Sequence, residues 1–307
     1  MKKGTLTSSL LLLLTATIWG MAFVAQSVGM DYMGPMTFNG IRFLMGGIVL
    51  LPLVLIGRKK KRKAEAPGRT GKTVVVGGLC CGLALCAASL FQQYGIMYTT
   101  VGKAGFITTL YIIMVPILGI FLKRRVPKKV FVAAIIAAAG MYLLCMSEKL
   151  SLGKGDILVF ICALLFSVHI MVVDHFSPMC DGIELSCIQF FAAGVVATLG
   201  ALIFEQPSLS GILAGILPLA YAGVMSSGVG YTLQVVAQKN LDPTIASLVM
   251  SLESVISVLA GWLFLHQVLT GRELLGCVLV FGAVILPRLD EQQRQIYTVM
   301  QQLKGNK

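Results

Sequence analysis

The chain has 307 residues, of which 57% are hydrophobic and only 12% charged, and its mean hydropathy is +0.87. Soluble globular domains carry roughly 25% charged residues, so this composition excludes a protein whose surface faces mainly water. The net charge of +12 gathers between apolar runs, chiefly at 58–72 and 123–129, without interleaved aromatic residues. This pattern argues against a nucleic-acid partner and favours loops that flank a membrane.

Taken in chain order, apolar stretches of membrane-spanning length begin at the N-terminus. The first follows a basic start like that of a signal peptide, but it reaches about 20 residues, which is long enough to span. The ten candidate spans are roughly 6–26, 35–57, 73–98, 101–122, 130–147, 157–175, 185–204, 212–236, 243–265 and 271–288. No stretch remains for a water-soluble catalytic domain and no nucleotide-binding loop is present. We therefore expect an all-α integral membrane protein of ten transmembrane helices, with no cofactor, no metal and no enzymatic activity.

The distribution of lysine and arginine predicts the orientation, because positive charge concentrates on the cytoplasmic side. With the N-terminus inside, the segments on that side hold 20 of the 25 Lys and Arg residues, counting Arg288. The other side holds Lys103, Lys149, Lys154 and Arg272. We therefore expect a multi-pass protein of the plasma membrane with both termini in the cytoplasm.

The two halves of the chain can be aligned with each other. With a shift of 147 residues, Phe43 meets Phe190; beyond the basic loop at 58–72 the shift becomes 142, and Tyr111 meets Glu253. Each half holds five candidate spans, and this odd number inverts the second half in the membrane relative to the first. Inverted repeats are typical of secondary transporters, whose site lies near the midplane between the repeats.

These observations predict the domain organisation. We expect a first repeat at 1–150 that includes the basic loop, a second repeat at 151–290, and a polar cytoplasmic tail at 291–307.

Glu253 lies inside an otherwise apolar span. Asp242 and Pro243 predict the start of this helix, as an N-cap followed by proline at the first helical position. Glu253 lies ten residues further on, which is about 15 Å and close to the midplane. A charge there is costly, so the side chain should face a cavity or a partner. It is either a substrate or proton site, or a structural glutamic acid that ties helices together.

Arg42 is a second charged residue inside a span, seven residues after Pro35. With Asn39 it forms a polar pair at spacing i, i+3. It could anchor an anion, pair with Glu253, or extend its side chain to the nearby surface.

Further polar side chains occur in the spans. Gln92 and Gln93 could supply uncharged hydrogen-bonding groups, and Tyr111 should lie near the midplane like its repeat mate. Trp19 is either cavity wall or plain packing. His169 could relay protons, although a single histidine on an apolar face is more often structural.

Pro116 and Pro218 are expected to interrupt their spans, the fourth and the eighth.

The sequence resembles the EamA family of the drug/metabolite transporter superfamily over about 285 residues. The matching stretches are IWGMAFV (18–24), IRFLMGGIVLLPL (41–53), GKAGFITTLYIIMVPILGIFL (102–122) and SLESVISVLAGWLFLHQVLT (251–270). The resemblance implies ten helices in two inverted repeats and a central cavity lined by helices one to four and six to nine. It also implies roles at the site for Trp19, Arg42, Tyr111 and Glu253.

The leading hypothesis is a secondary transporter, an exporter or exchanger of a small polar metabolite such as an amino acid. Arg42 and Glu253 could bind the two charges of a zwitterion, and Glu253 could couple transport to protons. Its partners would be that substrate and membrane lipid, and the chain would act as a monomer or homodimer. One alternative is proton-coupled efflux of cationic drugs.

Two other classes stay open. A membrane-embedded enzyme or metal site would need a constellation near an interface. The residues that could form one are Asp174, His175, Asp181 and Glu184, although an ordinary polar loop explains them as well. A purely structural membrane protein is disfavoured by the intramembrane glutamate.

Overall fold

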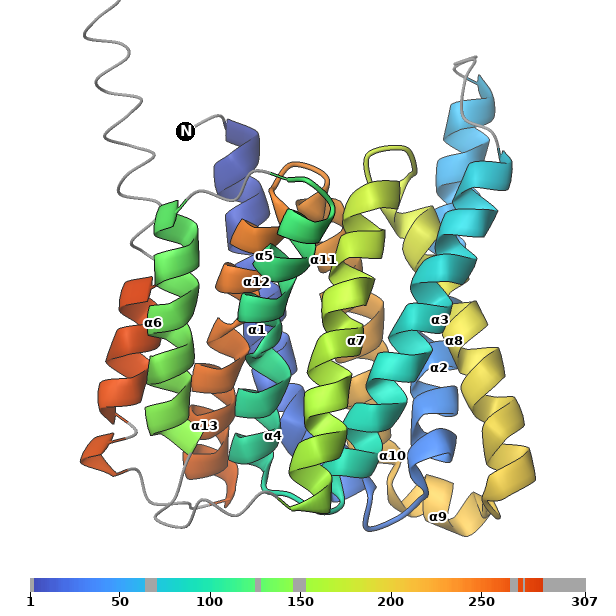
Figure 1. Ribbon diagram of the computed structural model, residues 1–307. Helices are drawn as coiled ribbons and strands as arrows, with labels where there is room; N and C mark the ends of the chain where they lie inside the picture. Colours follow the sequence, from blue (N-terminus) through green and yellow to red (C-terminus); the bar gives the residue numbers. More distant parts are fainter. Residues whose placement is uncertain are drawn as a thin grey trace, which may run out of the picture.

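The computed structural model describes residues 3–63, 71–124, 128–145, 153–265, 270–272 and 274–283, and the regular secondary structure of these residues is helical. The helices lie side by side and run roughly along one direction (Figure 1). Their bounds are α1 Lys3–Gly29, α2 Pro35–Lys63, α3 Gly71–Ile96, α4 Val101–Thr109, α5 Tyr111–Phe121, α6 Lys128–Cys145, α7 Lys154–Phe176, α8 Gly182–Phe204, α9 Leu209–Ala214, α10 Ile216–Ala220, η1 Tyr221–Tyr231, α11 Thr232–Gln238, α12 Pro243–Met250 and α13 Leu252–Leu265. The predicted tail at 291–307 lies outside the described residues.

Eight segments within the described ranges are long and apolar enough to cross a membrane, with 21 to 26 residues each. They coincide with eight of the ten predicted spans. At the two remaining positions lie α6 and a shorter apolar helix, Leu274–Ala283. The all-helical membrane fold is therefore confirmed, and the number of ten transmembrane helices stays a prediction.

Local sequence explains where several helices begin. The Asp242 side chain accepts a hydrogen bond from the Thr244 amide at 2.8 Å, with Pro243 at the first helical position of α12, as predicted. Asp181 caps α8 by accepting from the amides of Ile183 and Glu184.

The predicted fourth and ninth spans each consist of two helices. The first breaks at Leu110, between α4 and α5, and the second at Ser251, between α12 and α13. The expectation that Pro116 interrupts the fourth span was wrong in position, since this proline lies inside α5.

At the second break, four serine hydroxyls donate hydrogen bonds to backbone carbonyls three residues earlier, each at 2.8 Å. They belong to Ser247, Ser251, Ser254 and Ser257. Such bonds compete with the backbone ladder and bend helices.

The predicted eighth span also differs from a single α-helix. It continues from α10, which contains Pro218, into the π-helix η1 and then α11. π-Helical turns, which have hydrogen bonds from i to i+5, are rare and frequently lie at functional sites. This segment contributes Ser226 and Tyr231 to the interior, as described below.

The core of the molecule lies between the two halves of the chain. α2 packs along α8 and α3 along α7, while α4 contacts α13 and α5 contacts α12. Gly40 lies against Thr198 and Gly47 against Phe191, so α2 and α8 run antiparallel. A Cβ at Gly40 would lie 2.5 Å from the Thr198 Oγ1, so only glycine permits this approach. α6 and the short helix Leu274–Ala283 lie at one edge of the bundle and α8 at the other (Figure 1).

Candidate functional site

A small polar cavity lies between the two halves. The space that water-sized molecules can occupy there is about 30 Å³, which is room for about one or two waters. All lining residues are buried except Trp19, which is half-buried. The lining consists of Trp19, Ala22, Phe23 and Gln26 of α1, Arg42 of α2, Gln92 of α3, Thr108 of α4, Tyr111 of α5, Phe166 and Ile170 of α7, Ser226 and Tyr231 of η1, Gln234 of α11 and Glu253 of α13.

Glu253 occupies the first turn of α13, directly after the break at Ser251, and is 3% exposed. Tyr111, the first residue of α5, donates its hydroxyl to Glu253 Oε1 at 2.9 Å. The two residues are 142 positions apart, which is the shift that aligns the repeats. Corresponding positions of the two halves therefore contact each other directly.

Arg42 is 1% exposed, so its side chain does not extend to the surface. Its Nη1 donates to Gln26 Oε1 at 2.9 Å, and the guanidinium lies over the ring of Phe43 at 4.6 Å. Within the described residues, Nε and Nη2 have no hydrogen-bond partner. Arg42 and Glu253 line the same cavity, but among the described residues no ion pair joins them.

The two predicted glutamines differ in position. Gln92 lines the cavity and donates to Thr108 Oγ1 at 3.2 Å. Gln93 is fully buried outside the lining and donates to the Gln26 carbonyl at 3.0 Å. Gln26 itself was not predicted, although a glutamine late in an apolar span is the same signal that pointed to Gln92.

Aromatic side chains form one wall of the cavity. Trp19 packs against Tyr231 with ring centroids 4.5 Å apart and the ring planes tilted by 52°. Its Nε1 donates to the Ser226 carbonyl at 3.3 Å. His169 lies behind this wall, 6.0 Å from the Tyr231 ring, and its Nε2 bonds with Gln189 Oε1 at 3.2 Å. His169 is fully buried and does not line the cavity.

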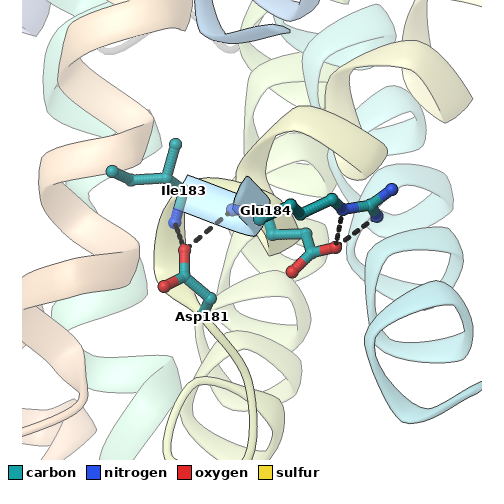
Figure 2. A network of polar contacts seen from close by, with 4 residues as sticks. Asp181, Ile183 and Glu184 are labelled. Atoms are coloured by element: carbon teal, nitrogen blue, oxygen red, sulfur yellow. Dashed lines mark hydrogen bonds and ion pairs between the residues drawn. The ribbon is translucent and has the colours of Figure 1, made fainter. Parts of the chain in front are cut away.

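The acidic residues considered for a metal site are engaged in other contacts. Asp174 pairs with Arg124 at 2.6 Å, and Glu184 pairs with Arg58. Asp181 caps α8 through the amides of Ile183 and Glu184, as Figure 2 shows. Within the described ranges, no group of three His, Cys, Asp or Glu side chains is arranged to hold a metal ion. The contacts with Arg124 and Arg58 both join the first half to the second at one end of the bundle.

Polar contacts also join the halves at the opposite end. Asp156 of α7 accepts from Lys103 Nζ at 2.9 Å and from Thr99 Oγ1 at 2.6 Å. Glu205, which follows α8, accepts from the Thr37 hydroxyl at 2.6 Å and from the first amides of α2. The cavity therefore lies between two sets of contacts that each link one half to the other.

Comparison with known proteins gives a consistent result. A model of the EamA-like transporter family matches twice, at residues 6–146 and 153–288. An uncharacterized transporter of Archaeoglobus fulgidus is 30% identical over 279 residues, covering 91% of this chain and 84% of the relative. The uncharacterized inner membrane transporter YedA of Escherichia coli is 25% identical, covering 89% and 88%.

One more relative and one solved structure extend this picture. Protein PecM of Dickeya dadantii is 26% identical, covering 88% of each chain. A protein crystal structure superposes with a TM-score of 0.75 over 93% of this chain and 98% of its own, at 17% identity. At that identity the superposition shows a shared fold and nothing about activity.

Proposed function

The chain belongs to the EamA-like transporter family, and from this premise we propose that it is a secondary transporter that exports or exchanges a small polar metabolite, such as an amino acid, by alternating access. The observation that carries the proposal is the buried polar cavity between the two halves, with the Tyr111–Glu253 pair inside it. A buried carboxylate, guanidinium and several amides in one membrane-embedded cavity are costly unless a ligand or ion uses them.

The contacts between repeat mates support an inverted arrangement of the halves. α4 precedes α5 and α12 precedes α13, yet α4 contacts α13 and α5 contacts α12. The two broken spans therefore run antiparallel. Because inverted halves can exchange conformations at similar free energy, such a pair can open alternately to either side.

In this proposal the small cavity corresponds to one state of that cycle, in which both sets of contacts between the halves are formed. A metabolite of several non-hydrogen atoms does not fit in about 30 Å³, so substrate entry requires the halves to separate at one end. Separation at one end would break the Arg58 and Arg124 pairs, and at the other end the Asp156 and Glu205 contacts. Only one set breaks at a time in alternating access.

Glu253 is the proposed coupling residue. Among the described residues its carboxyl receives one hydrogen bond, from Tyr111, and has no cation partner. A proton or a cationic group of the substrate could therefore occupy the same carboxyl in turn, which would link their movements in opposite directions. The proposed orientation has both termini in the cytoplasm; it is supported by the basic residues, since it places 20 of the 25 Lys and Arg residues on the cytoplasmic side.

The test is counterflow in proteoliposomes with a panel of amino acids, organic acids and cationic dyes, with and without a proton gradient. We expect one class to move, and Glu253→Gln to keep exchange but lose the response to the gradient. Asp31→Asn is the matched control, because Asp31 is an exposed acid outside the cavity. An unchanged gradient response in Glu253→Gln would refute proton coupling, and movement of cationic dyes alone would favour drug efflux.

A further inference from the structure

The guanidinium of Arg42 has one edge without a partner. Its Nη1 is bonded to Gln26, whereas Nε and Nη2 have no hydrogen-bond partner among the described residues, although the side chain is 1% exposed. Nε–H and the adjacent N–H of Nη2 point in parallel from the same edge of the plane. Their spacing matches the two oxygens of a carboxylate, which such an edge binds in a bidentate manner.

The surroundings hold this edge in one orientation. The face of the guanidinium lies 4.6 Å from the Phe43 centroid, and the Gln26 side chain fixes Nη1 at 2.9 Å. The main chain at Gln26 is itself held, because the Gln26 backbone carbonyl accepts from Gln93 Nε2 at 3.0 Å. Gln26 and Gln93 are thus positioning residues that leave the free edge of Arg42 in a defined place, and Arg42 lines the cavity.

No protein carboxylate in the described residues takes the place opposite this edge. Glu253, in the same cavity, bonds to Tyr111 instead. A buried cation with two unused donors is costly, and an oxyanion that accepts both would remove that cost.

We propose that the Nε–Nη2 edge of Arg42 is the binding site for the carboxylate of the transported molecule, a small organic acid with an apolar or flat body. The body would contact the aromatic wall formed by Trp19 and Tyr231. This proposal rests on the proposed function, since it assumes that the cavity holds the transported molecule. It assigns to the ligand a carboxylate, which a cationic drug does not carry.

The chain contains a convenient reporter of binding. It has two tryptophans: Trp19 in the cavity wall, and Trp262, which is 51% exposed on α13. Trp262→Phe leaves Trp19 as the single fluorescent indole beside the proposed site. Purified Trp262→Phe protein would be titrated with 4-methylpentanoate and its amide, leucine and leucinamide, and inorganic phosphate. These ligands do not fluoresce, and the pairs differ only at the carboxyl group.

We expect the two carboxylates to change the Trp19 emission, and the matched amides to bind at least about tenfold more weakly, because a bidentate charge-assisted contact is lost. Equal binding of acid and amide, binding of phosphate alone, or no carboxylate binding would overturn the proposal. This comparison needs no change at Arg42, so it stays decisive if Arg42 variants fail to fold.

Variants of the same protein test the edge itself. Arg42→Lys keeps the charge but loses the fork, and should weaken carboxylate binding by about tenfold or more. Gln26→Ala should weaken it less, because it frees the guanidinium without removing it. Arg272→Lys is the matched control, since Arg272 is exposed and lies over Tyr142, away from the cavity. Unchanged binding in Arg42→Lys would contradict the proposal.

The two proposals fail separately. If carboxylates bind at Arg42 but are not moved in proteoliposomes, the transport proposal fails and the binding site stands. If counterflow moves a substrate without a carboxylate, and Arg42→Lys leaves it unchanged, transport stands and the carboxylate site is refuted.

Discussion

Gly20 of α1 lies where this helix crosses α13 next to the candidate coupling residue. A Cβ at Gly20 would lie 2.5 Å from Ile256 Cβ and 2.8 Å from the Glu253 carbonyl oxygen. Ordinary contacts of this kind are at least 3.4 Å, so α1 and α13 would have to separate by about 1 Å locally. The Glu253 carbonyl is backbone and cannot rotate away, so shortening the Ile256 side chain would relieve only part of the clash.

We therefore predict that Gly20→Ala lowers the free energy of unfolding by about 1–3 kcal/mol, the usual cost of overpacking a well-packed interior. It should also reduce transport, because Trp19 and Glu253 flank the crossing. Gly102→Ala on α4 is the matched control: its Cβ would meet no atom within 4 Å, and alanine in a helix should stabilise by about 0.5–1 kcal/mol.

The assay is unfolding of both variants and the parent by SDS in mixed micelles, with counterflow on the same preparations. The two substitutions add the same methyl group and differ only in the space around it. Equal shifts for both, or a Gly20→Ala protein as stable and active as the parent, would refute the helix crossing described here.

Three further predictions use the same assays. Tyr111→Phe removes the hydrogen bond to Glu253, so it should lower the unfolding free energy by about 1–3 kcal/mol and slow transport. If neither the unfolding free energy nor the transport rate changed, the pair would not be formed. Asp156→Asn should also lower the unfolding free energy by about 1–3 kcal/mol, because the new amide NH2 would face groups that donate hydrogen bonds to the carboxylate. A change below about 0.5 kcal/mol would contradict this. Arg58→Gln should change the unfolding free energy by less than about 1 kcal/mol, since Arg58 is largely exposed in its pair with Glu184; a larger loss would show a stronger link between the halves.

Much of this architecture could be predicted from sequence. Apolar length indicated the spans, and the Asp242–Pro243 pair marked the start of α12 correctly. The burial of Glu253 was predicted from its position inside an apolar run, whereas for Arg42 the sequence left burial and extension to the surface both open. These predictions worked because they depend on local composition and on the cost of charge in a bilayer.

Other features depend on distances between helices, which periodicity does not supply. The alignment of the halves identified Tyr111 and Glu253 as mates, but contact between them requires the two broken spans to cross at those residues. The helix break at Leu110 was assigned to Pro116, because proline is the visible signal and the tertiary packing is not. Gln26 was missed since its importance comes from Arg42 on a neighbouring helix.

The contact between Tyr111 and Glu253 also bears on how such a chain can arise by duplication. In an assembly of two identical halves, both positions at this crossing would carry the same side chain. Two glutamates at 2.9 Å would repel each other when charged, and two tyrosines would offer no acceptor of comparable strength. Joining the halves into one polypeptide removes that restriction, because each position can then mutate alone. In the single chain a hydroxyl donor can therefore face a carboxylate acceptor at two positions that identical copies would keep the same.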